Sequence, residues 1–147
     1  MILPDLKIKK MVETGELIIS PFKIECLNPA GYDLRSSIDL LINPKEQKLI
    51  STLERIELPA NIAGFLHLRS SFIREGLIAG LALVDPGFKG QLTVSLFNTS
   101  LNEIKISQEE PFLQITFIQL QEKAEKPYSG KYQNSKGIMK SLRHEKT

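Results

Sequence analysis

Two arginines and two serines lie within six residues near the middle of the chain, in Arg69-Ser70-Ser71-Phe72-Ile73-Arg74. A guanidinium fork matches the oxygens of a phosphate, and serine hydroxyls and backbone N–H groups add further donors. If a helix begins here, its N-terminus also favours an anion. The alternative is an ordinary helix start, with Ser70 or Ser71 as the cap and both arginines in solvent. Arg69, Ser70, Ser71 and Arg74 are therefore candidates for binding phosphate.

A carboxylate follows the most apolar run of the chain, in Leu83-Val84-Asp85-Pro86-Gly87-Phe88. This position predicts Asp85 at the mouth of a pocket, where a partly desolvated carboxylate can act as a general base. Pro86-Gly87 forms a tight turn, and Phe88 is placed to pack on a base or a sugar. The alternative is a hairpin in which Asp85 stabilises its own turn through an Asx hydrogen bond.

Two other polar residues stand in settings that suit a binding site. Asp33 follows the small pair Ala30-Gly31, which lets the backbone pass close to another group. Gln114 lies among apolar residues and needs hydrogen-bond partners if it points inward. The alternatives are a turn glycine with a solvated aspartate, and a glutamine that faces solvent on an alternating strand.

The composition argues against several classes of protein. The 147 residues suit one domain, 1–147, and 41% hydrophobic and 24% charged residues are ordinary for a soluble globular chain. No apolar run is long enough to span a bilayer, and the N-terminus lacks the layout of a signal peptide. We therefore expect a cytoplasmic protein without membrane contact. A net charge of +2 predicts no nucleic-acid-binding face.

The thiol and imidazole groups of the chain are too few for a zinc site within one subunit. Cys26 is the only cysteine, and His67 and His144 are the only histidines. A zinc-dependent deaminase needs a His/Cys/Cys set with a glutamate. One cysteine also cannot form an internal disulfide. We expect Cys26 to be a buried bystander rather than a nucleophile.

The elements that must position these groups are mostly strands. Residues 1–15 are predicted to form a helix, with Asp5 as a possible cap, Leu6, Met11 and Val12 on one face, and Gly15 as the stop. Short strands are predicted at 17–19, 39–42, 48–58, 64–68, 77–84, 91–98 and 112–120. The apolar run 77–84 suits a strand that is buried on both faces. Many short strands indicate a sandwich, jelly roll or distorted barrel, and residues 123–147 are expected to form a tail.

The order of these motifs resembles the dUTPase/dCTP deaminase superfamily over nearly the whole chain. The matching segments are AGYDL, RSS, VDPGF, KGQLTVSLFN and FLQITF. The opening LPDLKIKKMVETGELIISPF, the closing AEKPYSGKYQNSKG, RSSFIREGL and DPGF look like dCTP deaminases, whereas PAGYDL looks like the first dUTPase motif. The resemblance implies a mostly β, distorted barrel or jelly roll of dUTPase-like type, with a short N-terminal helix and a flexible C-terminal tail.

One serine decides between the two activities of this superfamily. Deaminases of the family carry a catalytic glutamate where this chain has Ser95, while monofunctional dUTPases resemble it there, with Ser in the same place. Deamination needs a group that shuttles protons between water and the pyrimidine, and a serine hydroxyl has no useful pKa for this. The sequence therefore leads us to expect a dUTP diphosphatase, which releases dUMP and pyrophosphate.

The resemblance also implies a role for each candidate residue. Asp85 would activate water at the α-phosphate of dUTP, and Phe88 would pack on the deoxyribose. The strand 79–83, with Leu81 at its centre, would recognise uracil through its backbone. Further substrate ligands would be Arg69, Ser70, Ser71, Arg74 and Gln114, together with Lys131, Tyr132 and Gln133 from a tail that closes as a lid. Mg²⁺ would bind mainly through the triphosphate, with Asp33 reaching it through water, and a homotrimer would place its sites between subunits.

Some positions depart from the dUTPase pattern. Ala79 stands where many dUTPases use an asparagine on uracil, and Leu68 stands where a glycine usually precedes the arginine. The tail also lacks the glycine-rich fifth motif of trimeric dUTPases. Two alternatives therefore stay open. One is a dCTP deaminase, or a bifunctional deaminase-diphosphatase, that uses another acid in place of Ser95. The other is a non-catalytic nucleotide-binding protein of the same fold.

Overall fold

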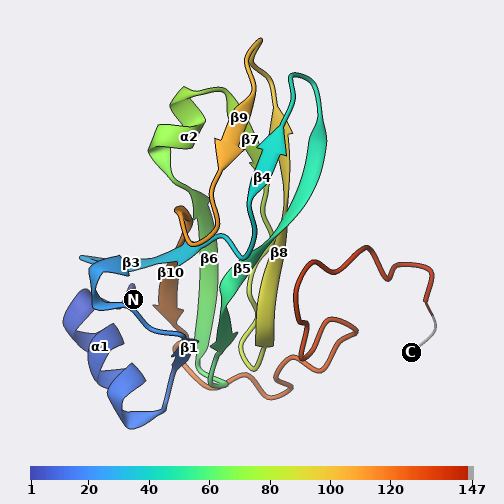
Figure 1. Ribbon diagram of the computed structural model, residues 1–147. Coiled ribbons are helices and arrows are strands. Elements are labelled where there is room, and N and C mark those ends of the chain that lie inside the picture. Colours follow the sequence, from blue (N-terminus) through green and yellow to red (C-terminus); the bar gives the residue numbers. More distant parts are fainter. Residues whose placement is uncertain (146–147) are drawn as a thin grey trace.

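The computed structural model describes residues 1–145, and most of its regular structure is strand (Figure 1). In chain order the elements are α1 (Asp5–Thr14), β1 (Ile18–Ser20), η1 (Ile24–Cys26), β2 (Leu27–Asn28), β3 (Gly31–Arg35), β4 (Leu40–Ile42), β5 (Gln47–Glu57), β6 (Ile62–Leu68), α2 (Ser70–Arg74), β7 (Leu77–Gly80), β8 (Lys89–Asn98), β9 (Ile104–Ile106) and β10 (Pro111–Gln119). The expectation of a mostly β chain with a short N-terminal helix is confirmed.

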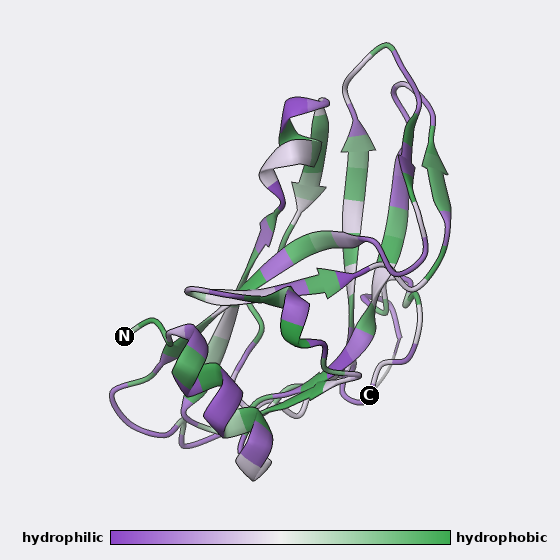
Figure 2. Ribbon diagram, turned by 60° about the vertical axis from the view of Figure 1, so that its left-hand side comes forward, coloured by the Kyte–Doolittle hydropathy of each residue, from purple (hydrophilic) through white to green (hydrophobic). Residues whose placement is uncertain are grey.

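Two four-stranded sheets and a two-stranded ribbon make up the β structure. The strand orders are β1-β5-β8-β7 and β2-β3-β10-β6, and β4 pairs with β9. Within the described residues the sheets do not close into a barrel. Alternation explains the core, because Leu92, Val94 and Leu96 of β8 are buried while the residues between them are not. The same banding is visible along the strands in Figure 2.

The N-terminal helix differs in detail from the sequence prediction. Pro4 occupies the N-cap position and no side chain caps the helix, so Asp5 is not the cap. Ile8 and Met11, three residues apart, form the buried face, whereas Leu6 is 75% exposed. Gly15 ends the helix with φ of 80°, a left-handed conformation that favours glycine, as expected.

The apolar run 77–84 is not a strand buried on both faces. Regular pairing with β8 ends at Gly80, and only Val84 makes a further bridge, to Gly64 of β6. Ile78 is 57% exposed and Leu83 51% exposed. The prediction failed because a run of apolar residues does not say whether its second face is covered by the same chain.

The middle of the C-terminal segment lies along β8, and its last described part turns away from the sheet (Figure 1). It contains no helix or strand up to residue 145, as a tail should. Its backbone is nevertheless fixed to β8, since Asn134 N donates to Lys89 O at 2.7 Å and Gln91 N donates to Ser135 O at 2.9 Å. The last two residues of the predicted 123–147 tail lie outside the described residues.

Among residues 1–145, no helix combines the length and the apolar character needed to cross a membrane.

Candidate active site

Four of the predicted ligands gather around one polar cavity of about 400 Å³. Asp33 comes from β3 and Gln114 from β10, because these two residues face each other in the strand register. Arg69 and Ser70 come from the junction of β6 and α2. Asn28 Nδ2 donates to Asp33 Oδ1 at 2.7 Å, and Arg69 Nε lies 3.5 Å from Asp33 Oδ2. The cavity thus combines an exposed guanidinium, a hydroxyl and amides, which suits a phosphate group.

The short helix α2 contributes less than the sequence suggested. It has only five residues, and Arg69 is its N-cap without a side-chain hydrogen bond, so neither serine caps it. Ser71 and Arg74 are exposed and do not line the polar cavity. Within one chain, they can meet a ligand only on the outer side of α2.

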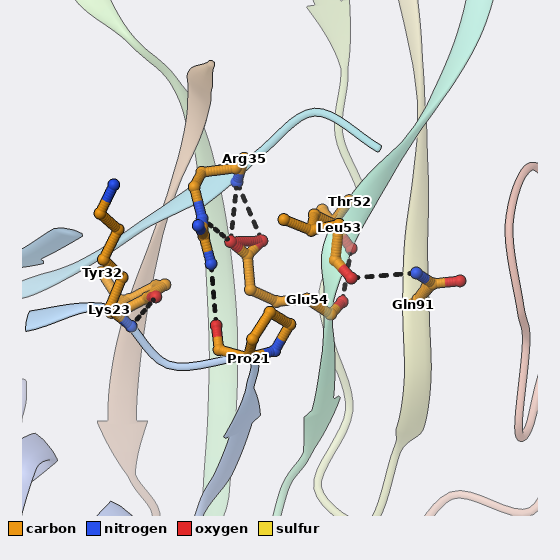
Figure 3. Close-up of polar contacts among 8 residues, drawn as sticks. All are labelled: Pro21, Lys23, Tyr32, Arg35, Thr52, Leu53, Glu54 and Gln91. Atoms are coloured by element: carbon orange, nitrogen blue, oxygen red, sulfur yellow. Dashed lines mark hydrogen bonds and ion pairs between the residues drawn. The ribbon is translucent and has the colours of Figure 1, made fainter. Parts of the chain in front are cut away.

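A buried ion pair supports the strand that carries Asp33 (Figure 3). Arg35 Nε donates to Glu54 Oε1 at 2.8 Å, and Glu54 also accepts the Arg35 backbone N–H. Arg35 donates as well to the carbonyl of Pro21 at 2.9 Å. Burial raises the pKa of the Glu54 carboxyl, and the hydrogen bonds and charge of Arg35 oppose that rise. A bulge in β5 between Ser51 and Arg55 makes this contact possible.

A second cavity, of about 540 Å³, lies between β8 and the tail. Its walls include Ser95, Phe88 and Tyr132. Ser95 Oγ accepts a hydrogen bond from Gln47 Nε2 at 2.8 Å. No acidic residue of the described chain lines this cavity. Leu81 is absent from its walls, although its neighbours Gly80 and Ala82 are present.

Asp85 lies outside both cavities. It is exposed and lines a third hollow, of about 690 Å³, with Phe65 and Tyr128. The partly desolvated setting predicted for Asp85 is therefore not formed by one chain. Phe88, three residues later, is 8% exposed and packs edge-on against Tyr128, with ring centroids 5.6 Å apart.

Asp85 and the polar cavity stand at opposite ends of β6. Val84 is bridged to Gly64, and Arg69 follows five residues further along the strand. At about 3.3 Å per residue this separates Asp85 from Arg69 by roughly 17 Å. Arg69 is also turned toward Asp33 and the carbonyl of Pro111, so Arg69 and Asp85 of one chain line separate cavities.

The three tail residues predicted to bind substrate already have partners within the chain. Lys131 Nζ donates to the carbonyls of Leu142 and Glu145. Tyr132 lines the second cavity, and its hydroxyl accepts from Leu142 N at 2.9 Å. Both ends of the Gln133 amide bind backbone groups of the 87–89 segment. Only Tyr132 of the three faces a cavity.

The expectation that Cys26 is buried agrees with the structure. Cys26 is 4% exposed, and burial raises the pKa of its thiol, which disfavours the nucleophilic thiolate. In residues 1–145 no three Cys, His, Asp or Glu side chains are grouped as a metal-binding set. Sequence reasoning missed Glu54, Gln47 and Gln91 because their partners lie far away in the sequence, so no local pattern marks them.

Comparison with known proteins identifies the family. The family model described as dCTP deaminase-like matches residues 36–120. The chain belongs to the dCTP deaminase-like family. A dCTP deaminase of Thermococcus kodakarensis is 44% identical over 158 residues, covering 97% of this chain and 99% of the relative. A relative from Sulfolobus islandicus rod-shaped virus 1, named a probable deoxyuridine 5'-triphosphate nucleotidohydrolase, is 35% identical over 94% of this chain and 96% of its own length.

Solved structures show that this dCTP deaminase-like chain has the fold of known dCTP deaminases and dUTPases. The dCTP deaminase of Agrobacterium tumefaciens superposes with a TM-score of 0.70 at 15% identity, over 79% of this chain and 47% of that one. The dUTPase of EIAV superposes with a TM-score of 0.58 at 26% identity, over 77% and 92% of the two chains. The superfamily and the dUTPase-like fold expected from the motifs are confirmed.

The prediction that this chain is primarily a dUTP diphosphatase is wrong. Curated relatives that are 42–45% identical over nearly the full length are dCTP deaminases. The sequence prediction rested largely on Ser95 and on the AGYDL motif, and these two features weigh less than similarity over 97% of the chain. The comparisons support an enzyme of nucleotide metabolism.

Proposed function

We propose that the chain is a dCTP deaminase, which converts dCTP and water to dUTP and ammonia. The observation that carries this proposal is its 44% identity to a dCTP deaminase over 97% of the chain. The cavity of about 540 Å³ beside β8 has the size of a nucleoside site. Its walls are mostly apolar, with some hydroxyl and amide side chains, which suits a flat, neutral base.

Because Ser95 stands where an acid/base is expected, the proposal needs another group for proton transfer. Water must lose a proton as it attacks C4 of cytosine, and the leaving amino group must gain one. Ser95 contacts Gln47 rather than an acid, so it does not supply this proton transfer. Asp85 is the carboxylate of the DPGF turn, whose Phe88 stands in the wall of this cavity, while Asp85 itself lines the neighbouring hollow. We assign the acid/base role to Asp85, so C4 of the cytosine would have to lie where the cavity beside Phe88 meets the hollow of Asp85.

The polar cavity suits the triphosphate of the same substrate. Arg69, Ser70 and Gln114 offer a guanidinium, a hydroxyl and an amide to phosphate oxygens. The cavity offers Mg²⁺ a single carboxylate, because Asp33 is the one acidic residue among the described residues that line it. Asn28 and Arg69 already contact the Asp33 carboxylate. The ion would therefore bind through the triphosphate, with Asp33 reaching it through water, and it would neutralise phosphate charge.

A homotrimer with sites between subunits would join the separated parts. Arg69 and Asp85 of one chain line separate cavities, so Arg69 of one subunit would serve Asp85 of the next. Ile73, Ile78 and Leu81 line an apolar groove beside α2 and are 56%, 57% and 38% exposed. Exposed apolar side chains of this kind are typical of subunit contacts.

A two-substrate assay tests the proposed activity. The protein is incubated with dCTP or with dUTP in the presence of Mg²⁺, and ammonia, pyrophosphate and the nucleotide products are followed. Ammonia and dUTP formed from dCTP would support the proposal. Ammonia together with dUMP and pyrophosphate would support a bifunctional enzyme with the same deaminase step. Pyrophosphate from dUTP without ammonia from dCTP, or no product at all, would overturn it.

A further inference from the structure

The inner part of the tail encloses the turn that carries Asp85 and Phe88. Tyr128 N donates to the carbonyl of Pro86 at 2.8 Å. The turn has no room on this side, because a Cβ atom added at Gly87 would lie 2.6 Å from Pro127 Cβ. Gly87 also has φ of 89°, so a side chain there would be strained in any case. The tail therefore packs directly on the catalytic turn.

One side chain joins the tail to both sides of this turn. The Gln133 Oε1 atom accepts from Lys89 N at 2.8 Å. Its Nε2 atom donates to the carbonyl of Gly87 at 2.9 Å and to that of Tyr128 at 3.3 Å. The amide thus bridges the two residues that flank Phe88. Among the described residues, no other side chain hydrogen-bonds to Gly87 O or Lys89 N.

The remaining backbone contacts of the turn come from Leu58 and from the turn itself. Leu58, which follows β5, donates to Phe88 O at 2.9 Å and accepts from Gly87 N at 3.1 Å, and Phe88 N donates to Asp85 O at 3.0 Å. They leave the half-buried Gly87 O and the exposed Lys89 N to the tail. A half-buried carbonyl without a partner is unfavourable.

We propose that Gln133 is a positioning residue, which holds the Asp85–Phe88 turn in the arrangement that the reaction uses. The role rests on the proposed function, because it acts through Asp85 and Phe88. Gln133 does not need to contact the nucleotide, and both ends of its amide are engaged elsewhere. Tail residues 127–135 therefore form a fixed wall of the site. This role does not depend on the segment after Gly137.

The test replaces Gln133 by Met, which keeps its length but removes the amide, and by Glu, which sets a carboxylate against the Gly87 carbonyl. Gln121→Met and Gln121→Glu are matched controls, since Gln121 is exposed and lies outside the three cavities. Amide hydrogen exchange at Lys89 is measured in all variants, well below the melting temperature. We expect exchange about fivefold to tenfold faster in both Gln133 variants and unchanged exchange in the controls.

Steady-state ammonia release from dCTP provides the second readout. Gln133→Met should lower kcat by about tenfold or more and change KM less, because a small displacement of a reacting group costs rate. A general loss of fold would instead change the active fraction and the exchange of amides throughout the sheet. Unchanged exchange at Lys89 would overturn the proposal, and so would faster exchange with unchanged kcat. If the unmodified protein releases no ammonia, the proposed function fails while the exchange result still tests the contact.

Discussion

At the residue scale, Asp85 carries the proposed proton transfer, and it is the most direct residue to test. Asp85→Asn keeps the size of the side chain but removes its basic oxygen. We expect ammonia release from dCTP to fall by about a hundredfold or more, while dCTP binding measured by calorimetry stays within a few fold. Glu125→Gln, an exposed change on the tail, is the control. Retained turnover in Asp85→Asn would refute the assignment.

Ser95 allows the opposite experiment, a gain of activity. Its side chain lines the second cavity and already binds Gln47. Ser95→Glu would place a carboxylate where deaminases of this superfamily have one, so we expect ammonia release to rise severalfold, whereas Ser95→Gln should not raise it. Equal rates for the two variants would mean that this wall of the cavity does not face the reacting base.

The sequence predicted some of the individual residues of the site correctly and misplaced others. Asp33, Arg69, Ser70 and Gln114 were identified from residue type, and the structure brings them to one cavity. Ser71 and Arg74 belong to the same motif but point elsewhere, because a short helix turns successive residues to different sides. A motif therefore indicates which region of the chain forms the site, but not which of its residues line the cavity.

At the scale of elements, the ion pair of β3 and β5 should dominate the stability of the region behind Asp33. Glu54 is fully buried and Arg35 is 7% exposed. Removing the charge of Glu54 leaves Arg35 buried without a counter-ion, so Glu54→Gln should lower the free energy of unfolding by about 3 kcal/mol or more. Urea unfolding measures this change.

Glu57 offers a matched control on the same strand. Its carboxylate lies 3.6 Å from Arg55 in a partly exposed pair, and Glu57→Gln should cost no more than about 1 kcal/mol of unfolding free energy. The double variant Arg35→Met/Glu54→Leu removes both buried charges and should recover much of the loss. Equal effects of Glu54→Gln and Glu57→Gln would contradict this account.

Strand positions were predictable where one face of a strand is covered and the other is not. The alternation in β8 and β10 located both strands, since side chains change face at every residue. The bulge in β5, which turns Glu54 toward Arg35, has no local signal. The burial of 77–84 was mispredicted for a related reason, because burial depends on neighbours that the segment itself does not specify.

At the scale of the whole molecule, the separation of Arg69 from Asp85 predicts complementation between two inactive variants. Arg69→Ala and Asp85→Asn are co-expressed with different tags, and the mixed oligomers are purified through both tags. If each site takes Arg69 from one subunit and Asp85 from the next, each doubly tagged trimer has both residues intact at about one third of its sites. Ammonia release from dCTP should therefore return to a measurable fraction of the normal rate.

Each single variant, purified alone, provides the baseline for this mixture. Sedimentation or light scattering establishes the size of the oligomer in the same samples. A mixture no more active than the two variants alone, in an oligomer of normal size, would contradict a site that is shared between subunits.

The N-terminal residues have a practical consequence for anyone who labels or immobilises this protein. The Met1 amine donates to Gln119 O, and Leu3 N donates to Phe117 O at 2.9 Å. The first residues therefore lie beside β10 and hydrogen-bond to it. A fusion partner at the N-terminus would therefore press on sheet structure. The loop between β8 and β9, where Leu101 is 87% exposed, is the better place for a dye or a surface anchor.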